Sequence, residues 1–445
     1  MTAAAKMKDS RVAWIGNIPA SWEMRKVSRS FRLISSGTTP SVADSAFHDE
    51  GSVPWVNTGD LNDDIVTTTA KKLTKQAVQT HSPLRVYSPG TLLVAMYGAT
   101  IGKVGILGVD ACTNQACCAL SDPKDLDTRF VYYWFLDNRR NLVALGYGGG
   151  QPNINQDLIR SLRVQAPRVA AQGQIAAYLD EATAQLNRLM ALRWRQMELL
   201  REQQAEVIQH VATRGLNPHV VMKDSIIPWL DQIPKHWQEL RIAIAVTKNT
   251  NGFVGPTRDI LVEDGVRYLQ SLHLKSGEIR FDKPYFVSEE WSHAHPKSIL
   301  QEGDVLVVQT GDVGQVAAVP KKFEGCNCHA LIILRMRSDV GSGSYLAMLL
   351  NAHFGKQALM RETTGALLPH LECGKIRDIR LPFPPPDEQE EILDFIQTQN
   401  ETFKALLSAY SRQLELLTEY RAALIHEFVT GQRAVDETVS VGDLA

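Results

Sequence analysis

Two stretches of the chain, 217 residues apart, carry the same pattern. Residues Ile376 to Gln389 read Ile-Arg-Asp-Ile-Arg-Leu-Pro-Phe-Pro-Pro-Pro-Asp-Glu-Gln, and residues Ile159 to Gln172 read Ile-Arg-Ser-Leu-Arg-Val-Gln-Ala-Pro-Arg-Val-Ala-Ala-Gln. At this offset, residues 152–213 align with 369–430 without a gap and share 17 identities, where unrelated segments of this length would share about 4. The chain is therefore a tandem repeat, and each copy ends in a closely matched tail.

The start of each copy is also marked. Trp14-Ile-Gly-Asn-Ile-Pro-Ala-Ser-Trp22 returns as Trp229-Leu-Asp-Gln-Ile-Pro-Lys-His-Trp237, 215 residues later. Between opening and tail, the two copies are only weakly similar. Each copy thus consists of a divergent globular part followed by a matched tail.

Each tail is expected to be one long helix. One glycine and no proline lie between Gln172 and Thr213, and neither lies between Asp387 and Thr430. Apolar residues recur every three or four positions, as in a coiled coil, and Gly215 and Gly431 follow the helix ends. We expect the two helices to pair antiparallel about a pseudo-two-fold axis, since each needs a partner for its apolar stripe. The alternative is two unpaired helices in separate solenoid-like domains.

The globular parts are typical of mixed α/β domains with short strands. Apolar runs bounded by Gly, Pro or Asn predict strands at 53–57, 90–97, 104–107, 265–270, 304–309 and 331–334, and helices at 130–145 and 345–361. The predicted fold class is α+β. It comprises two mixed α/β domains plus two long helices in an antiparallel coiled coil, arranged as a pseudo-two-fold tandem repeat.

Composition excludes several classes of protein. No apolar stretch reaches the ~20 residues of a membrane helix, and the first residues lack the apolar core of a secretory signal. The six cysteines show no paired zinc spacing and are expected to be small buried hydrophobes in a cytoplasmic protein. No HExxH, GxSxG or P-loop pattern is present. We expect no catalytic residue, cofactor or metal site.

The combination of motifs resembles the specificity subunits of type I restriction-modification systems. The resemblance rests on the two Ile-Pro-x-x-Trp openings, on Pro152-Asn-Ile-Asn155, on the Ile376–Gln389 stretch and on Leu416-Leu-Thr-Glu-Tyr-Arg-Ala-Ala-Leu-Ile-His-Glu-Phe-Val-Thr-Gly431. It covers the whole chain. One departure is Arg168-Val-Ala-Ala171 in place of Pro-Pro-x-Glu, which could alter the entry of the first helix.

The resemblance implies a non-catalytic, DNA-binding subunit. Each target recognition domain would read one half of a split double-stranded DNA sequence, and the helical spacers would set the gap. The chain would dock two modification subunits, which methylate adenine, and restriction subunits, which form an ATP-dependent translocating nuclease. The expected domains are 1–167 (recognition domain 1), 168–215 (spacer 1), 216–384 (recognition domain 2), 385–433 (spacer 2) and 434–445 (acidic tail).

The net charge of −2 argues against DNA binding only if it is spread evenly. Residues 14–166 hold 15 basic and 13 acidic residues, and residues 229–383 hold 18 and 17. The second helix and tail, residues 384–445, hold 4 and 12. Two nearly neutral recognition domains predict modest DNA affinity for the chain alone, since that affinity comes from phosphate neutralisation. We expect bound methylating subunits to supply much of the phosphate contact.

Base reading requires hydrogen-bonding side chains on loops that face a DNA groove. Strand ends and glycine-rich loops at matching places nominate thirteen residues, although each could equally be a turn-capping or solvated residue. They are Asn57, Thr58, Tyr97, Thr100, Lys103, Gln151, Asn153, Gln270, Ser271, His273, Gln309, Thr310 and His370. Phosphate candidates are Lys71, Lys72, Arg139, Arg140, Lys321, Lys322, Arg335 and Arg337.

The competing hypothesis is a non-catalytic scaffold whose paired helices bind partner subunits without reading DNA. A scaffold predicts similar, featureless globular halves. The halves instead diverge, as expected if each reads a different sequence.

Overall fold

The chain divides into two compact units. A computed structural model describes residues 6–41, 43–146, 153–365 and 369–435. Unit 1 consists of Met1–Arg193 with Arg412–Ala445, and unit 2 of Trp194–Ser411. Each unit therefore contains one globular domain together with part of each long helix.

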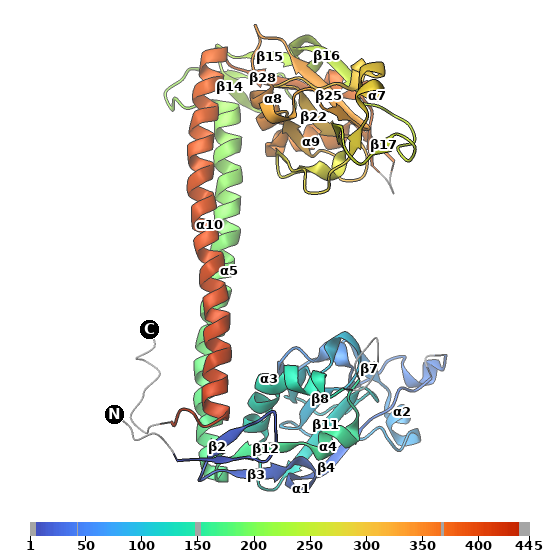
Figure 1. Ribbon diagram of the computed structural model, residues 1–445, viewed down its shortest axis with the longest axis vertical. Coiled ribbons are helices and arrows are strands. Elements are labelled where there is room, and N and C mark those ends of the chain that lie inside the picture. The colour runs from blue at the N-terminus through green and yellow to red at the C-terminus, as the bar shows by residue number, and fades with distance from the viewer. Residues whose placement is uncertain (1–5, 42, 147–152, 366–368, 436–445) are drawn as a thin grey trace. The chain divides into compact units, whose positions relative to one another are not determined.

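The two tails are long helices, as predicted. Helix α5 spans Val169–Arg214 and helix α10 spans Pro386–Val429 (Figure 1). The 46 residues of α5 correspond to about 70 Å of helix at 1.5 Å per residue. Arg168 does not displace the entry of the first helix. Helix α5 begins at Val169, which is the repeat equivalent of Pro386, the first residue of α10.

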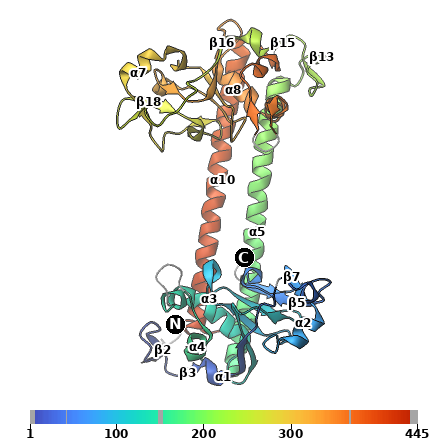
Figure 2. The ribbon, with the colours of Figure 1, turned by 90° about the vertical axis from the view of Figure 1, so that its right-hand side faces the viewer.

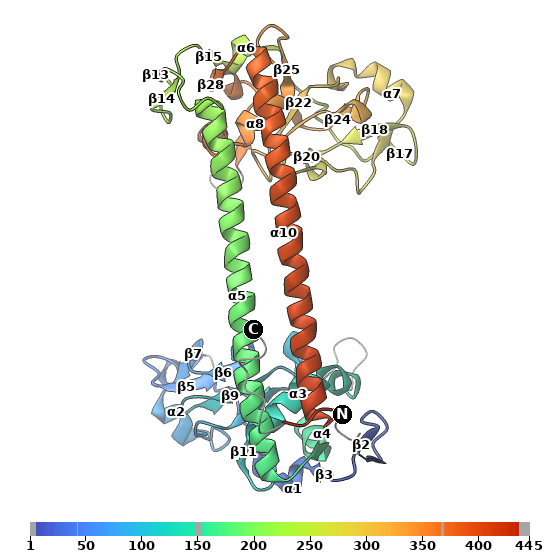
Figure 3. The ribbon, with the colours of Figure 1, turned by 90° about the vertical axis from the view of Figure 1, so that its left-hand side faces the viewer.

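The helices run antiparallel within each unit (Figure 3). As the residue number rises along α5, the number of its contact partner on α10 falls. In unit 1 the contacts are Tyr178–Phe428, with ring centroids 4.7 Å apart, and Met190–Thr418, with Sδ and Oγ1 3.7 Å apart. In unit 2 they are Gln204–Asn400, joined by a hydrogen bond of 2.7 Å, and the approach of Glu388 to the backbone at Gly215.

The globular domain of unit 1 consists mainly of short strands. Its strands are β1 (Met7–Asp9), β2 (Asn17–Pro19), β3 (Glu23–Lys26), β4 (Phe31–Ser36), β5 (Val53–Val56), β6 (Asp64–Val66), β7 (Lys71–Leu73), β8 (Leu92–Ala95), β9 (Val104–Leu107), β10 (Cys112–Thr113), β11 (Cys117–Pro123) and β12 (Arg163–Ala166). Its helices are α1 (Val27–Ser30), α2 (Lys75–Thr80), α3 (Thr128–Ala144) and α4 (Gln156–Ser161), with 3₁₀ turns η1 (Ser45–Phe47), η2 (Thr58–Asp60) and η3 (Gly98–Thr100).

The domain of unit 2 repeats this order. Its main strands are β13 (Met222–Asp224), β14 (Gln232–Pro234), β15 (Gln238–Arg241), β16 (Val246–Asn251), β17 (Leu261–Val262), β18 (Val266–Leu269), β21 (Phe286–Val287), β22 (Val305–Val308), β23 (Val316–Ala318), β24 (Asn327–Cys328), β25 (Leu331–Met336) and β28 (Arg380–Phe383). Two small hairpins are β19 (Leu274–Lys275) with β20 (Glu278–Ile279), and β26 (Thr363–Thr364) with β27 (His370–Leu371). The helices are α6 (Ile242–Ala245), α7 (Glu289–Ala294), α8 (Gly343–Asn351) and α9 (His353–Arg361), with 3₁₀ turns η4 (Ser271–His273), η5 (Pro296–Ser298), η6 (Lys321–Phe323) and η7 (Lys375–Asp378).

The main sheet of each domain is covered on both faces. In unit 1 its order is β4-β11-β8-β9-β6, and in unit 2 it is β16-β25-β22-β23. Along β8, Leu92 and Val94 pack with α3, while Leu93 and Ala95 pack with Val56 of β5 in the small β10-β5-β7 sheet. Figure 2 shows α3 and the strands β5 and β7 of this domain. Because alternate residues of a strand point to opposite faces, β8 is apolar throughout.

One predicted helix is wrong. Residues 345–361 were expected to form a single helix, but α8 and α9 are separate. Ala352 between them has extended backbone angles (φ −62°, ψ 158°) and serves as the N-cap of α9. The apolar periodicity of α8 and α9 is continuous in the sequence and therefore does not reveal this break.

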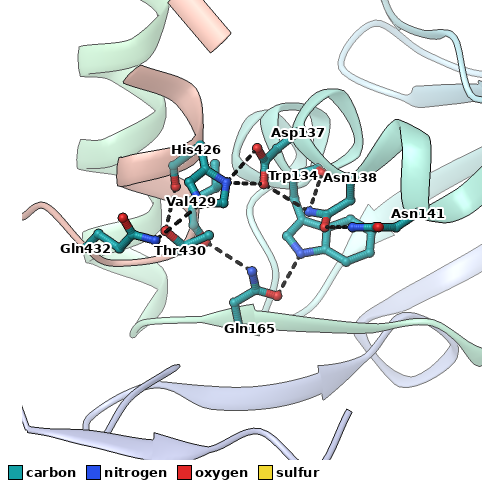
Figure 4. A network of polar contacts seen from close by, with 9 residues as sticks. All are labelled: Trp134, Asp137, Asn138, Asn141, Gln165, His426, Val429, Thr430 and Gln432. Atoms are coloured by element: carbon teal, nitrogen blue, oxygen red, sulfur yellow. Dashed lines mark hydrogen bonds and ion pairs between the residues drawn. The ribbon is translucent and has the colours of Figure 1, made fainter. Parts of the chain in front are cut away.

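The C-terminal end of α10 is bound to the first domain. Gln165 on β12 accepts a hydrogen bond from Trp134 Nε1 (2.8 Å) and approaches the Val429 carbonyl (Figure 4). His426 forms an ion pair with Asp137 of α3, with Nδ1 3.0 Å from Oδ1. Burial raises the pKa of Asp137, and the histidine opposes this effect. These contacts join the last turn of α10 to α3 and β12.

Candidate nucleic-acid interface

The carboxyl ends of several strands meet at one edge of the first domain. Strands β4 and β8 both run antiparallel to β11, so their last residues lie beside its first, with Ser36 opposite Cys118 and Ala95 opposite Cys117. Strand β10 runs parallel to β5 and leads directly into β11. We call the loops at this edge, residues 36–40, 57–60, 97–103, 113–116 and 153–155, the first reading edge.

The second domain has the same edge. Strands β16 and β22 end beside the start of β25, with Val308 opposite Leu331, and β18 and β24 end side by side. The corresponding loops are residues 251–255, 270–273, 309–315, 328–330 and 370–372, which we call the second reading edge. The loop geometry is thus built twice, although the loop sequences differ.

A chain of hydrogen bonds joins the loops of the first reading edge. Asn114 Nδ2 donates to Asn57 Oδ1 (3.1 Å), and Asn114 Oδ1 accepts from the backbone of Ala116 (3.0 Å). Met96 N then donates to the Ala116 carbonyl (2.8 Å), and Ile154 N donates to the Met96 carbonyl (3.0 Å). The structure therefore brings Asn57, Tyr97 and Asn153 to one edge.

The other nominated residues of the first domain lie on the same loops. Thr58 is half-buried in η2, and Lys103 is half-buried where the loop returns to the sheet. Thr100 Oγ1 donates to the Tyr97 carbonyl (3.1 Å) and so caps the turn. Tyr97 and Asn153 are exposed. Gln151 lies outside the described residues.

The second reading edge groups its nominated residues in an equivalent way. Thr310 Oγ1 and His370 Nδ1 are 2.8 Å apart, and Leu371 N donates to the Gln309 carbonyl (2.8 Å). This bond corresponds to the one between Ile154 and Met96 in the first domain. Gln309 itself is buried.

His273 lies inside the second domain rather than on its surface. Its side chain is fully buried, Nδ1 accepts from the Gln270 backbone (2.9 Å), and Nε2 donates to the Lys283 carbonyl (2.8 Å). Burial lowers the pKa of His273, so the neutral ring is favoured. Both ring nitrogens are engaged, so this histidine positions the loop that carries Gln270 and Ser271.

Four of the phosphate candidates form ion pairs inside their own domain. Arg139 bonds to Asp63 and to the Gly102 carbonyl. Arg335 bonds to Asp304 through two hydrogen bonds. Lys321 pairs with Glu324. Arg337 pairs with Asp339. Lys71, Lys72, Arg140 and Lys322 are exposed.

Sequence reasoning missed the loops after β4 and β16. They place Thr39, whose Oγ1 donates to Gln115 Oε1 (2.5 Å), on the first edge and Val254 on the second. The signal was available in Ser-Ser-Gly-Thr-Thr-Pro40, a run of turn-forming residues after an apolar strand. Asn114 and His329 at the entries to β11 and β25 were missed as well.

The metal-ligating and thiol side chains of the described residues form no further candidate site. No group of three or more His, Cys, Asp or Glu side chains there could hold a metal ion. Burial raises the pKa of the Cys112 thiol to about 11 and those of Cys117 and Cys118 to about 12, which suppresses their reactivity. None of the helices described is both long and apolar enough to cross a bilayer.

Comparison with known proteins gives consistent matches. The family model described as "Type I restriction modification DNA specificity domain" matches residues 19–194 and 259–415. The type I restriction enzyme MjaIX specificity subunit of Methanocaldococcus jannaschii is 23% identical over 438 residues, which cover 95% of this chain and 96% of that protein. The MjaVIII specificity subunit of the same organism is 19% identical over 420 residues, 93% of each chain.

Two solved structures share the fold. The first, described as "Structural basis underlying complex assembly and conformational transition of the type I R-M system", contains a chain that superposes with a TM-score of 0.72 at 14% identity. That match covers 94% of this chain and 99% of the other. The HsdS subunit from Thermoanaerobacter tengcongensis superposes with a TM-score of 0.52 at 14% identity, over 94% and 98% of the two chains.

Proposed function

The chain belongs to the type I restriction-modification DNA specificity family, and from this membership we propose that it reads a split DNA target. Each recognition domain would bind one half-site through its reading edge. As a specificity subunit the chain is non-catalytic. The chemistry then belongs to the modification and restriction subunits, and this chain determines where they act.

The observation that carries the proposal is the duplicated edge with divergent side chains. Equivalent places on the two edges hold Asn57 and Gln270, Tyr97 and Thr310, and Asn153 and His370. A groove of DNA presents donors, acceptors and methyl groups, so a changed side chain on an unchanged backbone selects a different base. Two such edges on one chain suit a bipartite target with unequal halves.

The long helices suit a spacer. A continuous α-helix rises 1.5 Å per residue, so inserting or deleting whole turns in α5 and α10 together would change the gap between the half-sites. Both helices enter after proline and end before glycine, which fixes their length.

Matched apolar surfaces on the helices support the docking of two modification subunits. Leu189 and Leu416 are 39% and 47% exposed in unit 1, and Leu406 and Leu199 are 40% and 47% exposed in unit 2. The members of each pair lie at the same level in the antiparallel register, and the leucines of one unit are the repeat equivalents of those in the other. Isolated exposed leucines are common, but the same exposed pair kept in both copies indicates two equivalent partner sites.

Methylation sequencing tests the reading function. The chain is expressed with its modification subunit in a host lacking other adenine methylation, and the methylated positions of the genome are determined. One bipartite adenine-methylated motif is expected. A continuous motif, or none, would refute the proposal.

Stoichiometry tests the docking surfaces. Leu189→Gln with Leu416→Gln is expected to reduce the number of bound modification subunits from two to one, measured by native mass spectrometry. Val169→Gln is the matched control, because Val169 is equally exposed on α5 but belongs to neither pair. Retention of two modification subunits by the double variant would exclude this surface.

A further inference from the structure

The loop after the first strand of the main sheet is built in the same way in both domains. A Cβ on Gly37 would lie 1.7 Å from the Thr113 carbonyl oxygen, and one on Gly252 would lie 2.4 Å from that of Cys328. Only glycine fits there, so each loop passes directly against the end of the neighbouring strand. Two residues later, the first loop presents Thr39 and the second presents Val254.

The second loop is held firmly in place. Phe253 N donates to the Cys328 carbonyl (2.9 Å), and the Phe253 carbonyl accepts from Ala330 N (2.9 Å). The Phe253 ring packs edge-on against Trp291 and His295, at centroid distances of 5.0 and 5.2 Å. The backbone that presents the next residue, Val254, is therefore fixed before any ligand arrives.

Val254 is the more exposed of two large apolar side chains that are exposed on the second reading edge, the other being Leu272 at 37%. The exposed fraction of Val254 is 65%, among the highest of the large apolar residues described. It borders a cavity of about 400 Å³ whose apolar lining includes Phe253, Ala294 and Pro296. A branched aliphatic side chain in this position contributes little to the core and can form no hydrogen bond.

We infer that Val254 is a specificity-determining residue that contacts the 5-methyl group of a thymine in the second half-site. This inference rests on the proposed DNA-reading function. Among the four unmodified bases, thymine alone carries a methyl group in the major groove, and an apolar side chain recognises it by contact. Burying about one methyl group is worth a three- to fivefold change in affinity.

The first domain shows that this position can change its chemistry without changing its shape. Thr39 has nearly the size and branching of valine, but its hydroxyl donates to Gln115 Oε1 (2.5 Å). The first edge therefore presents a hydroxyl and an amide where the second presents two methyl groups.

Deoxyuridine substitution tests the inference. The full chain is assembled with its modification subunits and bound to duplexes that carry the target found by methylation sequencing. Each thymine is replaced singly by deoxyuridine, which lacks only the methyl group. The wild type is expected to lose three- to fivefold in affinity when one particular thymine is replaced. At that position Val254→Asn should bind thymine and uracil equally, and Val254→Thr should keep part of the wild-type difference.

Val262→Asn is the matched control. Val262 is 42% exposed in the same unit. It pairs with Phe286, which also pairs with Arg267 near the start of β18, so Val262 lies away from the reading edge at the end of that strand. The Val262→Asn protein should bind all duplexes as the wild type does, and thermal melting verifies that all three variants fold.

Three results would overturn the inference: target half-sites without thymine, no deoxyuridine effect in the wild type, or an unchanged effect in Val254→Asn. Failure of the wild-type assembly to bind any bipartite target would instead refute the proposed function itself, and this inference with it. The two failures are therefore distinguishable.

Discussion

Replacing Arg335 with methionine tests whether this arginine serves the fold or the DNA. Its Nε and Nη2 donate to Asp304 Oδ1 and Oδ2 at 2.6 and 2.8 Å. The Asp304 side chain is completely buried, and its Oδ2 also accepts from the backbone of Gln301 (2.8 Å). Arg335→Met would leave a buried carboxylate with one hydrogen bond and without its bidentate partner, so that the half-buried Lys248 nearby is the remaining positive charge.

The expected cost follows from the asymmetry between breaking a buried ion pair and replacing it. Removing one partner typically costs about 3–5 kcal/mol, because the remaining charge stays buried. A domain of this size shifts its melting temperature by about 2–4 °C per kcal/mol. The transition of unit 2 should therefore move down by about 6–20 °C. Arg335→Met combined with Asp304→Asn should recover most of the loss, since the buried carboxylate is then absent as well.

Differential scanning calorimetry measures this shift. The control is Arg337→Met, two residues further along the chain. Arg337 pairs with Asp339 at 2.6 Å, but this pair is open to solvent, so its loss should leave the melting temperature almost unchanged. An Arg335→Met protein with wild-type stability and weaker, less salt-dependent DNA binding would refute the structural reasoning. It would support a phosphate contact instead.

Three further outcomes are expected. Because burial lowers the pKa of His273, the unfolded state binds more protons than the folded state below about pH 6.5, and the stability of unit 2 should fall from pH 7.5 to 5.5. Thermal melts of His273→Gln should show a smaller pH dependence. Gly252→Ala should abolish site-specific binding in gel-shift assays through its clash with the Cys328 carbonyl, whereas Gly374→Ala, with open space around it, should not. Gln165→Leu leaves the Trp134 indole N–H without its partner, and should cost about 1–3 kcal/mol in denaturant unfolding.

The long helices could be predicted because their evidence is periodic and appears twice. Both predicted helices agree with α5 and α10 to within a few residues. The strands β8 and β22 could be predicted because they are buried on both faces and therefore continuously apolar. These features depend on local composition, which a single sequence displays.

The details of the reading edges could not be predicted, because they depend on strand register. His273 and Ser271 look alike in the sequence, as polar residues after a strand, yet the histidine is buried and the serine exposed. The close approach of Gly252 to Cys328 joins residues 76 positions apart in the chain. The pairing of β16 with β25, together with the bridge between Phe253 and His329, brings these segments together.

The repeated Ile-Pro-x-x-Trp motif and the repeated glycine after each long helix contact each other in the structure. Gly215, after α5, lies against Trp237 of the second motif, and Gly431, after α10, lies against Trp22 of the first. Each helix thus leaves one domain and ends on the opening motif of the other. The opening motif of each copy therefore contacts the helix end of the other copy. A change in one helix end would have to fit an opening motif that has not changed, and this requirement favours identity between the two tails. The described loops of a reading edge pack within their own domain, and under the proposed function they would otherwise contact a half-site, so each edge is free to diverge, as Thr39 and Val254 illustrate.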